Sequence, residues 1–167
     1  INIWVLLMFI VLLYPKYALS YPWPVEEFDE QSYTIVGTLG EYRSSSRYHA
    51  GIDIAAPVGT EVYHVVDGEI VFLTGISDEN GRVEVKSSDG TINRYLHIKR
   101  GSSLKLKQNV TASTTLLGVV GDTKPPHLHF EEALGAKNPL RVGGLTPFND
   151  VANPVIESEM TFWRQGT

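Results

Sequence analysis

The chain has 167 residues and a formal net charge of −5, and 43% of its residues are hydrophobic while 20% are charged. This composition is typical of a globular chain with one ordinary core. Lys and Arg form no cluster, so we predict no nucleic-acid partner. The absence of Cys excludes disulfides and thiolate metal sites, and any metal must be held by His, Asp or Glu.

Residues 1–20 differ in composition from the rest of the chain. Ile1–Tyr14 is an apolar run that is short for a membrane span, and Ala18-Leu19-Ser20 is similar to a signal-peptidase cleavage site. We predict an N-terminally truncated secretory signal helix, followed by a linker over residues 21–32; a buried helix and an uncleaved signal anchor are the alternatives. The protein is then exported to the periplasm, cell envelope or extracellular space, with no membrane contact beyond this segment.

Residues 33–139 have the pattern of an all-β domain. Turn-forming residues recur about every eight to twelve positions, and no long segment has a 3.6-residue apolar period. The alternating run GRVEVKS is followed by the turn Ser88-Asp89-Gly90, which predicts a hairpin whose second strand carries His97. Further short strands are predicted in EVYHVVDGEIVFL (61–73), SLKLK (103–107) and LLGVV (116–120).

The composition changes again after Pro139. Residues 139–154 are rich in Pro and Gly, which is typical of a linker, and VIESEMTFW (155–163) then alternates like a strand. We predict that residues 140–167 comprise a linker and the start of a truncated C-terminal β domain.

Two of the five histidines lie one residue apart in KPPHLHFEE (124–132). Residues i and i+2 of a strand point to the same face, so His127 and His129 are expected to project side by side while Leu128 and Phe130 pack behind them. A strand with this pattern can offer two imidazoles to one ion.

A second polar pair, His49 and Asp53, has the spacing HxxxD. Gly51, the β-branched Ile52 and Ile54, and Pro57 disfavour a helix, so we expect a bend that leads into a strand. There the imidazole and carboxylate could converge with His129 into a set of two histidines and one aspartate, which suits zinc and leaves a position for water.

The order HxxxD, YLH, HLH resembles that of the lysostaphin-type zinc metalloendopeptidases, the LytM domain of peptidoglycan hydrolases. The resemblance covers about residues 40–139 and is carried by GEYRSSSRYHAGIDIAAPVGTEVYHVVDGEIV, TINRYLHI and PPHLHFE. It implies a secreted endopeptidase that cuts peptide cross-links of bacterial peptidoglycan. The fold expected is all-β, with antiparallel β-sheets that form a groove, a duplicated hybrid motif of barrel-sandwich type.

The same resemblance implies roles for five residues. His49, Asp53 and His129 would be ligands of Zn²⁺. His97 and His127 would be the non-ligand histidines that act on water and on the developing oxyanion.

Other features leave questions open. His64 belongs to no motif and is expected to be structural or exposed, while Tyr95 either lines the groove or packs within its strand. The segment GDTKPPHLHF (121–130) replaces the family's glycine-rich loop, which leaves peptide specificity undetermined. Two other function classes are a non-catalytic LytM-like regulator of another cell-wall hydrolase, a kind of relative that typically lacks metal ligands, and a biotinyl or lipoyl carrier.

Overall fold

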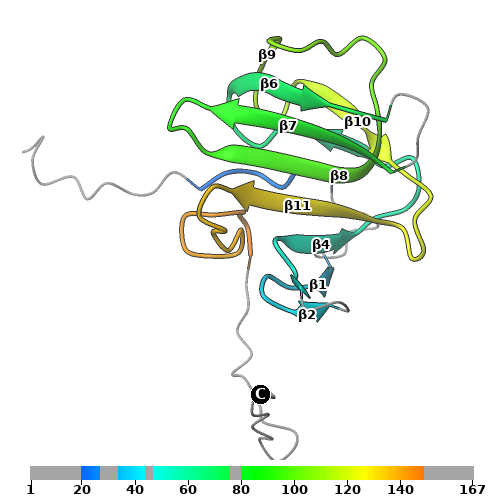
Figure 1. Cartoon of the computed structure of the whole chain (residues 1–167), viewed down its shortest axis with the longest axis vertical. Coiled ribbons are helices and arrows are strands. Elements are labelled where there is room, and N and C mark those ends of the chain that lie inside the picture. The colour runs from blue at the N-terminus through cyan, green and yellow to red at the C-terminus, as the bar shows by residue number, and fades with distance from the viewer. Residues whose placement is uncertain (1–19, 27–33, 44–46, 76–79, 149–167) are drawn as a thin grey trace, which may run out of the picture.

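The structure, a computed structural model, describes residues 20–26, 34–43, 47–75 and 80–148, and these residues form strands and turns without a helix (Figure 1). The strands are β1 (Ile35–Gly37), β2 (Tyr42–Arg43), β3 (Arg47–Tyr48), β4 (Ile52–Ala55), β5 (Glu61–Tyr63), β6 (Gly68–Leu73), β7 (Gly81–Ser87), β8 (Ile92–Arg100), β9 (Asn109–Val110), β10 (Leu116–Val120) and β11 (His127–Ala133). Within these ranges no helix could cross a membrane. The predicted signal helix lies, apart from Ser20, outside the described residues.

The strands form one antiparallel sheet and one small hairpin. The sheet has the order β1-β4-β11-β8-β7-β6-β9, and β10 pairs with the end of β8 and with β5, so the sheet continues into a second layer (Figure 1). Strands β2 and β3 pair only with each other. The predicted all-β, antiparallel fold is therefore confirmed.

The side chains of the core pack between strands β4, β11, β8 and β7 and the second layer. Ile54, Leu128, Phe130 and Tyr95 are fully buried on one face of the sheet, and they belong to one cluster with Leu117 of β10. Because side chains alternate along a strand, burial of these residues directs their neighbours on β4 and β11 to the opposite, open face. That open face carries the polar residues of the site.

Most of the predicted strands are present. The β7–β8 hairpin turns at Ser88-Asp89-Gly90, where Gly90 has a φ of 87° that favours glycine. The prediction of a strand over residues 103–107 is wrong: this segment forms two turns, closed by hydrogen bonds from Leu104 N to Gly101 O and from Gln108 N to Lys105 O. Leu104 is buried, but Leu106 is 59% exposed together with both lysines, so the alternation does not correspond to the two faces of a strand.

Segments predicted to be linkers also contact the core. Trp23 and Val25 are buried in the core cluster together with Leu145, and Tyr21 forms a β-bridge with Leu145. Trp23 Nε1 donates a hydrogen bond to the Pro147 carbonyl at 2.8 Å. The packed unit thus includes described residues on both sides of 33–139, while the division into domains stays a prediction and residues 149–167 lie outside the described part of the chain.

Candidate active site

Pairing of β4 with β11 brings the first site residues together. Asp53 is the register partner of His129, and His49 lies just before β4, beyond a bend at Gly51. A side chain at Gly51 would collide with the backbone carbonyl of Phe130, so glycine allows this bend to approach β11 closely. The predicted bend leading into a strand is confirmed.

Three polar atoms converge at this point. His49 Nε2 lies 3.0 Å from Asp53 Oδ1 and 2.8 Å from His129 Nδ1, and His129 Nδ1 lies 2.8 Å from Asp53 Oδ1. All three residues are buried. They form a cluster that could hold a metal ion.

The outer nitrogens of both rings contact oxygen acceptors. His49 Nδ1 donates to the Thr38 carbonyl at 2.8 Å, and His129 Nε2 donates to Glu131 Oε1 at 2.9 Å. A neutral imidazole carries one proton, so these contacts leave His49 Nε2 and His129 Nδ1 as lone-pair donors facing Asp53. Three such atoms repel one another unless a cation lies among them, and two imidazoles with one carboxylate are a suitable set for zinc.

The electrostatics of the cluster favour a cation. Burial raises the pKa of the Asp53 carboxyl, but contact with His129 in its protonated form and the charges of neighbouring histidines lower it by more, and the net shift is downward. Burial lowers the pKa of His129, whereas its contacts with Asp53 and Glu131 raise it above the ordinary value. A proton and a metal ion therefore compete for the same position.

His97 reaches the same face through a β-bulge. Its neighbours Leu96 and Ile98 pair with Arg82 and Gly81 of β7, and His97 is the extra residue between them, with a φ of 63°. A bulge bends the strand and redirects a side chain, and for a non-glycine residue this φ is strained. The ring therefore points toward the site: its centroid lies 6.0 Å from that of His129.

His97 and His127 form a second pair beside the first. Their ring centroids are 4.7 Å apart. His97 Nδ1 donates to Asn80 Oδ1 at 2.5 Å and His127 Nδ1 donates to the Pro125 carbonyl at 2.7 Å, so both Nε2 atoms have free lone pairs. Burial, assisted by the charges of neighbouring histidines, lowers the pKa of His97 to about 4, and its imidazole is neutral at neutral pH. His127 Nε2 lies 3.7 Å from Asp53 Oδ1.

These residues line an open groove with a volume of about 520 Å³. All five site residues predicted from the sequence line it, as do Arg43 and Tyr48 from the β2–β3 hairpin. Arg43 Nη2 donates to Asp53 Oδ2 at 2.7 Å, so the second carboxylate oxygen is engaged and Oδ1 alone faces the histidines.

Sequence analysis missed two contributors to this geometry. Glu131 orients His129, and its position two residues further along the same strand was a signal that strand periodicity could have used. Arg43 gave no such signal, because its contact with Asp53 depends on how the β2–β3 hairpin folds over β4.

The remaining histidine and tyrosine lie in the core. His64 and Tyr95 are both fully buried, and the Tyr95 hydroxyl donates to His64 Nδ1 at 2.7 Å while it accepts from the Val65 amide at 3.1 Å. Of the alternatives left open, Tyr95 is therefore a packed strand residue and does not line the groove. His64 is structural rather than exposed.

Comparison with known proteins agrees with this geometry. The model of peptidase family M23 matches residues 47–139. The DD-carboxypeptidase/endopeptidase Mpg of Neisseria meningitidis serogroup B is 33% identical over 106 residues, which cover 60% of this chain and 24% of that protein. The peptidoglycan DD-endopeptidase ShyC of Vibrio cholerae is 36% identical over 100 residues, which cover 56% of this chain and 22% of that protein. The chain thus spans about a quarter of the length of these relatives.

A solved structure supports the fold. The catalytic domain of the antimicrobial peptidase lysostaphin from Staphylococcus simulans superposes with a TM-score of 0.51 at 24% identity, covering 62% of this chain and 84% of that one. The chain belongs to peptidase family M23, which agrees with the lysostaphin-type resemblance of its sequence motifs.

Proposed function

We propose that the protein is an exported zinc metalloendopeptidase that hydrolyses peptide cross-links of bacterial peptidoglycan. The observation that carries this proposal is the convergence of His49 Nε2, Asp53 Oδ1 and His129 Nδ1 in a groove that holds two further histidines. The named activities of the relatives Mpg and ShyC support peptidoglycan as the substrate class.

In this proposal His49, Asp53 and His129 hold the ion. Zinc, when bound, supplies a Lewis acid that polarises a carbonyl group and lowers the pKa of water. Thr38 and Glu131 fix the proton on the outer nitrogen of each ligand histidine, so the inner nitrogens stay available. Arg43 keeps the Asp53 carboxylate in one orientation.

His97 and His127 act on the reacting groups. The lone pair of His97 Nε2 can accept a proton from attacking water, because its Nδ1 is held by Asn80 and its low pKa keeps it neutral. His127 Nε2 lies beside Asp53, where a protonated ring would stabilise the oxyanion of the tetrahedral intermediate. Neither residue is needed to hold the metal.

The alternative of a non-catalytic LytM-like regulator is less well supported. Such relatives typically lack metal ligands, whereas this chain keeps the full set of five residues in one groove. A biotinyl or lipoyl carrier would have no use for the histidine cluster. Mass spectrometry of muropeptides released from purified sacculi tests the proposal: cross-linked dimers should decrease and monomers increase, with the glycan intact. Unchanged muropeptides with zinc bound would favour the regulator.

A further inference from the structure

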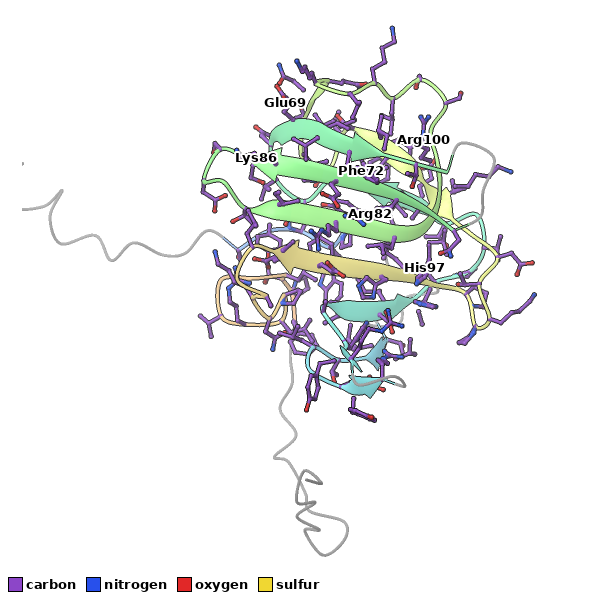
Figure 2. The ribbon with its side chains drawn as sticks, in the orientation of Figure 1. Glu69, Phe72, Arg82, Lys86, His97 and Arg100 are labelled. Carbon is purple, nitrogen blue, oxygen red and sulfur yellow. The ribbon has the colours of Figure 1, made fainter. Side chains whose placement is uncertain are left out.

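A line of alternating charges crosses the open face of the sheet and ends at the candidate metal site. Arg82 of β7 contacts Glu84 of the same strand, and Arg94 Nε of β8 lies 3.1 Å from Glu84 Oε1. Arg94 Nη1 donates to Glu131 Oε2 of β11 at 3.0 Å, and Glu131 Oε1 accepts from His129 Nε2 at 2.9 Å. Arg82 begins the line above the ring of Phe72 on β6, where Figure 2 labels both residues.

Arg94 is the central member of this line. Glu84 and Glu131 are both buried, and a buried carboxylate is costly unless a cation or hydrogen-bond donor satisfies it. The guanidinium of Arg94 contacts both carboxylates at once through different nitrogens. The planar guanidinium presents its donors in a rigid arrangement, so it fixes the relation of the two carboxylates more firmly than a flexible ammonium group would.

Arg94 thereby fixes the orientation of Glu131. One oxygen of Glu131 is bound to Arg94 and the other to His129, so the carboxylate cannot rotate without losing a contact. An acceptor fixed in this way holds the His129 proton on Nε2 and leaves the lone pair on Nδ1.

We propose that Arg94 is a positioning residue that sets the metal affinity of the site through Glu131 and His129. The inference rests on the proposed function, in which His129 is a metal ligand. It goes beyond that function because it assigns a role to a residue of β8 that does not itself contact the metal-ligand cluster.

The opposite face of β11 supplies a matched control. Glu132, the next residue, has a side chain that is only 3% exposed and accepts from Arg141 Nη1 at 2.6 Å. Replacing Arg141 therefore also leaves a buried glutamate on β11 without its arginine. Arg94 also contacts Glu84, but the difference that the test uses is that only a carboxylate held by Arg94 touches a histidine of the site.

The experiment compares Arg94→Met with Arg141→Met. Zinc affinity is measured by competition with a chromophoric chelator, and the absorption spectrum of the Co²⁺-substituted protein reports ligand geometry. Arg94→Met should weaken zinc binding by about 10- to 100-fold and shift the Co²⁺ spectrum, as expected for loss of an outer partner of a ligand histidine. Arg141→Met should lower thermal stability while its zinc affinity and spectrum match the wild type.

A conservative variant guards against misfolding of Arg94→Met. Arg94→Lys keeps the charge but lacks the rigid planar donors, so its zinc affinity should lie between those of the wild type and Arg94→Met. Equal zinc affinity in all four proteins would overturn the inference, and so would an equal loss in the Arg94 and Arg141 variants.

His129→Ala separates this inference from the proposed function. If His129→Ala loses zinc while the Arg94 variants retain wild-type affinity, only the role of Arg94 fails. If His129→Ala also retains zinc, the ligand assignment fails, and with it both proposals.

Discussion

The domain buries histidines in two places: a core group of His64 and Tyr95, and an Asp53 group of His49, Asp53 and His129. The ring protons are arranged in opposite ways in the two groups. His64 accepts a hydrogen bond from the Tyr95 hydroxyl at Nδ1, and its Nε2 is buried without a hydrogen-bond partner among the described residues. His49 and His129 instead donate from their outer nitrogens to oxygen atoms and direct lone pairs at Asp53. Burial of a histidine therefore does not identify a metal site. The candidate metal site is instead marked by a hydrogen-bond acceptor at the outer nitrogen of each ring and a carboxylate at the inner nitrogen.

The largest expected effect follows from breaking the Asp53 group. His49→Ala or Asp53→Ala should lose zinc and peptidase activity together, because two remaining protein ligands rarely retain zinc. Metal content of the purified variants and hydrolysis of a cross-linked muropeptide check this. Full zinc occupancy in both variants would remove these residues from the ligand set.

A smaller effect is expected when His97 is changed. His97→Ala should keep about one zinc per chain and lose activity by about 10²-fold or more, because a general base contributes on that order without holding the ion. His127→Ala tests the proposed role of His127 at the oxyanion in the same way. Turnover near that of the wild type in His97→Ala would contradict its place in the mechanism.

Changing the core group should affect stability alone. Tyr95→Phe removes the hydroxyl that donates to His64 and accepts from the Val65 amide. Leaving buried polar groups unpaired should lower the free energy of unfolding by about 1–3 kcal/mol. Urea unfolding measures the loss, and unchanged zinc content and kcat/KM in the same variant show that Tyr95 is outside the groove chemistry. A large drop in kcat/KM at full folding would contradict this.

The pH dependence of stability sharpens the comparison further. Burial lowers the pKa of His64 from 6.5 to about 3. Above pH 6.5 the His64 side chain is therefore neutral in both the folded and the unfolded chain, and it does not make the free energy of unfolding depend on pH. As pH falls from 6.5 toward 3, the unfolded chain binds a proton that the folded chain excludes, and stability should decrease by up to about 1.4 kcal/mol per pH unit. Unfolding free energies of wild type and His64→Gln across this range provide the test, and the slope should be smaller in the variant. Equal slopes would show that His64 does not remain neutral in the fold.

Sequence patterns predicted the parts of this site that depend on local spacing. The HLH pair lies on a strand with Leu128 and Phe130 behind it, as alternation requires, and HxxxD lies on a bend. The family resemblance then joined these segments, which are 80 residues apart in the case of His49 and His129.

Local patterns could not predict features that depend on tertiary pairing. Strict alternation along β8 would place His97 on the same face as Tyr95, in the core, and only the bulge with its positive φ turns it to the groove. The contact of Arg94 with Glu131 requires that β8 and β11 come into register, and that of Arg43 with Asp53 requires that the β2–β3 hairpin fold against β4.

The most direct test of the ligand assignment is to locate the metal. Anomalous diffraction from crystals of the zinc-loaded protein, measured on both sides of the zinc absorption edge, should give one strong peak bounded by His49 Nε2, Asp53 Oδ1 and His129 Nδ1. A peak elsewhere, or none in a preparation that still cleaves cross-linked muropeptides, would contradict the account.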